Sequence, residues 1–137
     1  MIIADTGAIL ALLDKGDRHH RAIRALYDEG PGEWLLPWAI LPEVDYLVAS
    51  ELGARAQEVF LADLAEGAFA VEYGRHQDLI RAGQIARKYG ALRLGLIDAV
   101  VMATAERLQA DAIATLDLRH FASVTLAGSP RLFPRDR

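Results

Sequence analysis

Cysteine is absent from this 137-residue chain. Its absence excludes a disulfide scaffold, a thiolate metal site and a cysteine nucleophile. It also fits the reducing cytoplasm, where we expect this protein to reside. No apolar run is long enough to cross a membrane, and residues 1–13 lack the basic segment that begins a secretory signal peptide. We therefore expect a cytoplasmic protein with no membrane partner.

Positive charge is also scarce. Lysine and arginine total 15 against 19 aspartate and glutamate residues, which gives a formal net charge of −4. Proteins that coat nucleic acid non-specifically are usually basic, so any contact with nucleic acid should be local or assisted by metal ions. The hydrophobic fraction of 53% and the chain length predict one folded domain over residues 1–137. Its polar end, residues 129–137, is expected to be a loose tail.

Short apolar segments alternate with helical patterns along the chain. Strands are expected near residues 1–5, 34–37, 69–73, 112–115 and 124–126. Helices are expected near residues 6–14, 18–29, 39–52, 54–66, 76–89 and 96–109, with a short helical turn at 118–121. Strands separated by helices indicate parallel βαβ units. The expected fold is a three-layer α/β/α arrangement with a mostly parallel central sheet of about five strands.

Acidic residues follow or interrupt apolar segments at three places. Asp5 ends the first expected strand, and Asp117 lies just past the strand expected at 112–115. Asp98 interrupts the most apolar stretch of the chain, residues 94–105. Burying a carboxylate without a partner costs on the order of several kcal/mol. Each of these acids therefore needs a partner.

The expected fold can bring these acids together. Ligand sites in open parallel sheets form at the carboxyl ends of the strands, where the strand order reverses, and Asp5 and Asp117 share that edge if their strands are neighbours. Asp98 falls in the first turn of its helix, where the helix dipole favours negative charge, and Glu43 lies early in the helix after the second strand. Carboxylates at one rim suit Mg²⁺ or Mn²⁺. Such a site hydrolyses phosphodiesters with metal-activated water.

Each acid also has a purely structural interpretation. Asp5 can cap the first helix, Asp98 can be a helix-start residue favoured by the dipole, and Asp117 can be a turn or cap residue. Glu43 can be an exposed helix residue, and helical phase does not separate it from Asp45, which flanks the apolar stripe as closely on the other side. The metal-site hypothesis requires all the acids to converge.

Four motifs, taken in order, match one protein family. They are I-I-A-D-T-G-A at residues 2–8, L-P-E-V at 41–44, L-G-L-I-D-A-V-V-M-A-T-A at 94–105 and I-A-T-L-D-L-R-H-F at 113–121. In these motifs and in size, the chain resembles the PIN-domain ribonucleases, and most closely the VapC-type toxin subunits of prokaryotic toxin–antitoxin pairs. The resemblance extends over nearly the whole chain, and no acidic position of the family pattern is missing.

The resemblance implies both a site and an activity. It implies an acidic quartet around Mg²⁺ or Mn²⁺ that consists of Asp5, Glu43, Asp98 and Asp117. Glu43 is thereby selected over Asp45, and Thr6 and Thr115 match the supporting polar positions of the family. The implied activity is that of an endoribonuclease that cleaves structured RNA such as tRNA or ribosomal RNA. Family members are held inactive by a cognate antitoxin, whose C-terminal segment enters the acidic groove, and they usually form homodimers.

Basic residues near the acids are candidate contacts for RNA phosphates. Arg93 and Arg119 lie beside two of the acidic segments, and either contact phosphate or form simple ion pairs with the acids. A second cluster, which includes Arg18 and Arg21, either supplies local positive charge for RNA or is a solvated helix face. The solvated face is the preferred interpretation. Trp34 and Trp38 flank the second strand, and we expect core or dimer packing there rather than base stacking.

Two other functions agree with parts of the sequence. Residues 3–8 resemble the D-T-G loop of aspartic proteases, in which two carboxylates share a proton. That class is nearly all β, whereas this chain has at least four long helical patterns, and a chelator would leave such a protease active. The second alternative is a non-catalytic PIN-like module that binds RNA or protein. Loss of RNA cleavage in Asp5→Asn or Asp98→Asn variants that still fold would exclude it.

Overall fold

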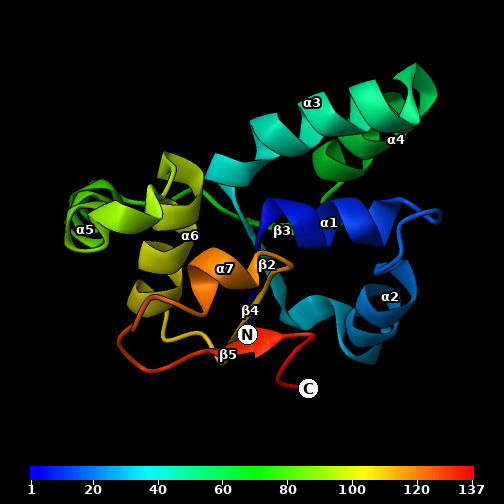
Figure 1. Ribbon diagram of the computed structural model, residues 1–137. Helices are drawn as coiled ribbons and strands as arrows, with labels where there is room; N and C mark the ends of the chain where they lie inside the picture. Colours follow the sequence, from blue (N-terminus) through cyan, green and yellow to red (C-terminus); the bar gives the residue numbers. More distant parts are fainter.

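A five-stranded parallel sheet forms the centre of the protein, as a computed structural model of residues 1–137 shows (Figure 1). The strand order is β3-β2-β1-β4-β5, and every neighbouring pair is parallel. The strands are β1 Ile2–Ala4, β2 Trp34–Pro37, β3 Ala70–Glu72, β4 Ala112–Ala114 and β5 Arg131–Phe133. The predicted α/β class and parallel sheet are confirmed.

Helices form two separate sets around the sheet. The first set is α1 Thr6–Leu13, α2 His20–Glu29, α3 Leu41–Leu52 and α4 Ala54–Ala65; the second is α5 His76–Lys88, α6 Leu96–Arg107 and α7 Leu118–Phe121. Short 3-10 turns cover Pro31–Glu33, Trp38–Ile40 and Gly90–Leu92. The connections from β1 to β3 cross the sheet in one direction and those from β3 to β5 in the other. Because parallel crossovers are right-handed, the two sets lie on opposite faces, which gives the expected three layers (Figure 1).

The hydrophobic core lies between the sheet and these helical layers. It contains 31 buried apolar residues in one cluster. All of β4 is buried, as are Ile3 and Ala4 of β1, which is typical of central strands in parallel sheets. The core therefore fixes the carboxyl ends of β1 and β4. None of the helices combines the length and hydropathy that a membrane span requires.

The last strand lies at a different place from the prediction. Residues 124–126 do not form a strand, and β5 is instead found within the segment that was expected to be a loose tail. Its Leu132 and Phe133 are buried, and the strand pairs with β4 along its full length. Val124 and Leu126 are buried as well, but in a loop. Apolar character alone did not distinguish the two segments.

The two tryptophans have different environments. Trp34 is buried in the core and packs edge-on against Tyr27, with ring centroids 5.4 Å apart. Trp38 lies just beyond β2 and is 53% exposed. Core packing is therefore confirmed for Trp34, whereas for Trp38 only the other expected role, packing in a dimer, stays a prediction.

Candidate active site

The strand order reverses between β1 and β4, which are parallel neighbours at the centre of the sheet. Ile2–Ala4 aligns with Ala112–Ala114, so Asp5 and Thr115 are the first residues beyond the two aligned strand ends. The backbone N–H of Asp5 donates to the carbonyl oxygen of Ala114 at 2.9 Å. Thr115 Oγ1 donates to Asp5 Oδ2, also at 2.9 Å. The register of the sheet thus places Asp5 in the crevice where open parallel sheets bind ligands.

Asp98 and Asp117 meet at a histidine beside this crevice. Asp98 lies in the first turn of α6, and Asp117 is the N-cap of α7, where its Oδ1 accepts the backbone N–H of His120 at 3.2 Å. Nδ1 of His120 is 3.1 Å from Asp98 Oδ2 and 2.8 Å from Asp117 Oδ2. One ligand atom from each of the three residues lies within 4.8 Å of the others. Asp117 therefore acts as a helix cap and also belongs to a potential metal-binding group.

Burial and neighbouring negative charges raise the pKa values of Asp5 and Asp98. The pKa of Asp5 is raised to about 6, chiefly because the side chain is buried; the charges of Asp98 and Asp117 add to the rise, and the hydrogen bond from Thr115 opposes it. Burial also raises the pKa of Asp98, with further contributions from Asp117 and Glu43. The contributions of the neighbouring acids require short distances between like charges. The structure thus brings Asp5, Asp98 and Asp117 together at one edge of the sheet.

Glu43 and Asp45 differ in what they face. Glu43 is exposed in the first turn of α3, outside the three-residue group, but close enough for its charge to raise the pKa of Asp98. Asp45 Oδ1 instead accepts a hydrogen bond of 2.9 Å from Nε2 of Gln57 on α4. The side of α3 that carries Glu43 is therefore the side that faces the acids.

His120 was given no role in the sequence-based prediction. Its position three residues after Asp117 was visible within the last motif, and side chains at that spacing meet on one side of a helical turn. The approach of Asp98 from α6 was not visible, because it depends on how α6 packs against α7. The i, i+3 spacing was thus the signal available in the sequence. The contact between α6 and α7 then brings Asp98 to the same imidazole.

Two buried hydroxyl groups, those of Thr6 and Thr115, accompany the acids. Thr115 Oγ1 donates to Asp5 and accepts the backbone N–H of Asp117 at 3.1 Å, so it links two acids. Thr6 Oγ1 is buried next in sequence to Asp5 and has no hydrogen-bond partner. A buried hydroxyl without a partner is costly. Together with clustered carboxylates and an imidazole, it makes a donor set that suits a hydrated divalent ion.

The candidate arginines divide into two groups. Arg93 precedes α6 in a left-handed backbone conformation, Arg119 lies on α7, and both are exposed without an ion pair, so the ion-pair alternative is not observed. Arg18 and Arg21 lie at or beside the start of α2, which packs at the far end of α1 from Asp5 (Figure 1). Arg93 and Arg119 are therefore the nearer candidates for contact with phosphate.

Replacing Thr115 with valine should weaken the site without removing an acid. Thr115→Val removes the hydroxyl that donates to Asp5 and accepts from Asp117. We expect a loss of about 1–3 kcal/mol in the free energy of unfolding, measured with urea, and a further rise in the pKa of Asp5, because its hydrogen bond from Thr115 lowers that pKa. The exposed hydroxyl of Ser50, replaced by alanine, serves as the control. Equal stability of Thr115→Val and the parent protein would contradict the linking role.

Comparison with known proteins gives the family. The PIN-domain family model matches residues 2–125. The chain belongs to the PIN-domain family. It is 32% identical to ribonuclease VapC26 of Mycobacterium tuberculosis over 130 residues, which is 95% of this chain and 96% of that protein. The fold, the motif order and the family match agree, and the nearly all-β architecture of the aspartic proteases does not fit this PIN-domain chain.

Solved structures share the fold at lower sequence identity. The crystal structure of VapC20 of M. tuberculosis, a toxin that cleaves the sarcin–ricin loop, superposes with a TM-score of 0.81 at 20% identity, over 93% of this chain and 98% of that one. A chain of a toxin–antitoxin complex from Klebsiella pneumoniae gives a TM-score of 0.70 at 18% identity, over 90% and 92%. At these identities, the likeness demonstrates the fold shared by this PIN domain.

Proposed function

We propose that this PIN-domain protein is a VapC-type toxin, an endoribonuclease that uses Mg²⁺ or Mn²⁺ to hydrolyse a phosphodiester bond in structured RNA. The observation that carries the proposal is the convergence of Asp5, Asp98 and Asp117 at the point where the strand order reverses. Burial, together with the like charges of the neighbouring acids, raises the pKa values of Asp5 and Asp98 there. A divalent ion is the simplest partner that relieves this repulsion. The 32% identity to a VapC ribonuclease supports the same activity.

The chain's own groups have distinct roles in this proposal. Asp98 and Asp117 would hold the ion together with the buried carboxylate of Asp5, and the exposed Glu43 would orient its water shell. When bound, the ion would supply an activated water and neutralise charge on the phosphate. Thr115 holds Asp5 and the Asp117 backbone in position. Nδ1 of His120 lies within hydrogen-bond distance of both Asp98 and Asp117, and its imidazole is itself a possible ligand.

The proposed partners follow from the same family. We infer that a cognate antitoxin neutralises the toxin, and the structural likeness to a chain of a toxin–antitoxin complex supports this. The proposed substrate is an RNA of the tRNA or ribosomal RNA class, and a homodimer in the cytoplasm is the proposed form. Arg93 and Arg119 are the proposed contacts for phosphate, because both are exposed and lie beside the elements that carry Asp98 and Asp117.

The metal requirement is tested with purified protein and folded tRNA and ribosomal RNA. Cleavage should occur with Mg²⁺ or Mn²⁺, stop with EDTA and return when excess ion is added, because carboxylates are the proposed ligands. Cleavage that persists in EDTA would contradict the metal proposal. The absence of cleavage of any RNA would favour a non-catalytic binding module.

Glu43 and Asp45 provide a matched pair of variants. Glu43→Gln should lower the rate of cleavage about 10- to 100-fold, as loss of an outer carboxylate does at other metal sites, whereas Asp45→Asn should leave it nearly unchanged because Asp45 faces Gln57. Both substitutions remove one negative charge from α3, so net charge is controlled. Initial rates at saturating Mg²⁺ measure the effect. Equal effects of the two substitutions would remove Glu43 from the proposed site.

A further inference from the structure

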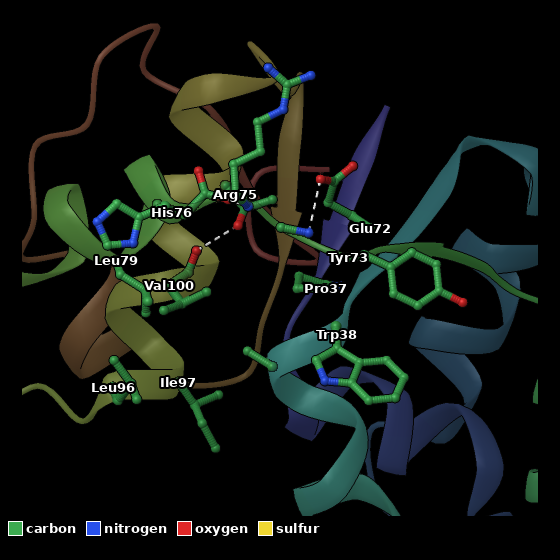
Figure 2. Close-up of a pocket in the computed structure, with 14 residues that line it drawn as sticks. Pro37, Trp38, Glu72, Tyr73, Arg75, His76, Leu79, Leu96, Ile97 and Val100 are labelled. Atoms are coloured by element: carbon green, nitrogen blue, oxygen red, sulfur yellow. Dashed lines mark hydrogen bonds between the residues drawn. The ribbon is translucent and has the colours of Figure 1, made fainter.

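A groove of about 440 Å³ lies between the ends of β2 and β3 and the helices α5 and α6 (Figure 2). Its volume falls within the range of about 300–1,000 Å³ that is typical of ligand pockets. Trp38 and Tyr73 form one wall, and the apolar side chains opposite include Leu79, Leu96 and Ile97. The next residue along α6 is Asp98. The groove and the proposed active site therefore share the first turn of α6.

The aromatic wall consists of two exposed, stacked rings. The ring centroids of Trp38 and Tyr73 are 5.6 Å apart with an angle of 26° between the ring planes. Pro37 and Glu72, the last residues of β2 and β3, are paired in the sheet. Trp38 and Tyr73 follow them directly in the chain, so the two rings lie side by side. Trp38 is 53% and Tyr73 is 75% exposed. We call this pair the aromatic shelf.

The charges around the groove suit a phosphate backbone. The two acids that line it, Glu72 and Asp78, are both bonded to the guanidinium of Arg107, at 2.6 and 2.8 Å. Arg75 and His76 lie at the rim, are exposed and form no ion pair. The groove thus combines an apolar interior with one exposed guanidinium, that of Arg75, at its rim. Single-stranded RNA has the complementary arrangement, with apolar base faces and a negative backbone.

The sheet register places the shelf close to the acids. Ile3 aligns with Leu35, so Asp5 is level with Pro37, the residue before Trp38. Neighbouring strands are about 4.8 Å apart, and β2 is next to β1. Pro37 therefore lies about one strand spacing from Asp5, and Trp38 is the next residue of the chain. An RNA strand with a phosphate at the acids can place an adjacent base in the groove.

We propose that the aromatic shelf stacks an unpaired base of the RNA substrate, next to the phosphate held at the acidic residues. The inference rests on the proposed function and adds a subsite to it. Proteins recognise unpaired RNA bases by stacking them on aromatic side chains, and paired bases are unavailable for this. The shelf would thus direct cleavage to loops and bulges of structured RNA.

Binding of a labelled single-stranded oligoadenylate tests the shelf, with an abasic ribose-phosphate oligomer of equal length as the second probe. Fluorescence anisotropy in EDTA measures both, so that cleavage does not interfere. Trp38→Ala and Tyr73→Ala should each weaken oligoadenylate binding about 5- to 150-fold, the range expected for loss of one stacked base. The abasic oligomer should bind all the proteins equally. Tyr46→Ala is the matched control, because Tyr46 is 70% exposed on α3 and does not line the groove.

Three results would overturn the proposal. Unchanged oligoadenylate binding by both shelf variants would exclude stacking, and an equal loss for the abasic oligomer would assign the contact to phosphate. If Trp38→Ala leaves RNA binding intact but converts a dimer to a monomer in sedimentation, the shelf is an interface between copies of the chain. Circular dichroism checks that the variants fold, and Trp38→Leu, which keeps an apolar side chain, should still lose stacking. Because no cleavage is needed, failure of the shelf and failure of the nuclease proposal are separate results.

Discussion

Asp5→Asn is expected to abolish RNA cleavage and, in the metal-free protein, to increase the free energy of unfolding. Cleavage is lost because a neutral amide is a much weaker ligand for a divalent ion than a carboxylate. Stability rises because the Asp5 side chain is 5% exposed and its charge is unfavourable where it lies. Asparagine keeps an oxygen that accepts the hydrogen bond from Thr115. The variant therefore separates catalysis from folding.

The size and the pH dependence of this stabilisation follow from the pKa of Asp5. The difference between the usual value of 3.8 and about 6 corresponds to about 3 kcal/mol at neutral pH. The folded protein holds this proton more tightly than the unfolded chain, so the stability that Asp5 contributes is present below pH 3.8 and is lost as the pH rises through about 6. Asparagine does not ionise, so the Asp5→Asn variant does not lose this stability as the pH rises. Its stability should exceed that of the parent protein at pH 7 and approach it at pH 4.

Thermal and urea unfolding at pH 4 and pH 7 in EDTA measure this effect, and cleavage assays at neutral pH measure the loss of activity. Asp45→Asn is the control, since it removes a charge at a hydrogen-bonded position away from the acids. In the parent protein at limiting Mg²⁺, cleavage should fall as the pH drops through about 6, because protonated Asp5 does not bind the ion. An Asp5→Asn protein that is less stable at pH 7, or that cleaves RNA normally, would contradict the assignment of Asp5.

Arg107→Ala is expected to cause the largest loss of stability, about 3–5 kcal/mol. The Arg107 guanidinium donates to Asp78 Oδ1 at 2.8 Å, to Asp78 Oδ2 at 3.1 Å and to Glu72 Oε1 at 2.6 Å. It thereby joins the end of β3, the start of α5 and the end of α6. Removing it leaves the buried carboxylate of Asp78 without its charged partner, and this uncompensated burial accounts for the size of the effect.

Urea unfolding of matched variants tests this interpretation. Arg55→Ala is the control, because its ion pair with Glu58 is exposed and should contribute about 0.2–1 kcal/mol or less. The double variant Arg107→Met/Asp78→Asn should recover part of the lost stability, since the neutral amide can still accept the backbone N–H of Arg75 that Asp78 accepts at 3.0 Å. If Arg107→Ala unfolds at the same urea concentration as the parent protein, the network contributes little and the interpretation is wrong.

The sequence predicted where the acids lie on the secondary structure. The apolar runs before Asp5 and Asp117 indicated strands that end at an acid, and both strands, β1 and β4, are found there. Local patterns contain this information because the alternation of strands and helices depends on neighbouring residues. Which strands are neighbours depends on contacts over about 110 residues, as the bond between Thr115 and Asp5 illustrates. From the sequence alone, Asp5 and Asp117 were therefore expected to meet only if their strands were neighbours.

Two details depended on packing and could not be read from local patterns. Helical phase left Glu43 and Asp45 equivalent until α4 placed Gln57 against Asp45. The last strand was predicted at residues 124–126. Both apolar segments near the C-terminus are buried, and only pairing with β4 selects residues 131–133. Three-residue strands carry too little periodicity to be distinguished from apolar loops.

The sequence by itself determined the fold class, the order of the strands and helices along the chain and the residue types of the proposed site. The tertiary structure decided that β1 lies beside β4, that His120 bridges Asp98 and Asp117, and that Trp38 stacks on Tyr73 outside the core. The physical reason is the range of the interactions. Hydrophobic periodicity and helix ends are local, whereas sheet register, helix packing and the repulsion between distant carboxylates exist only once the chain is folded.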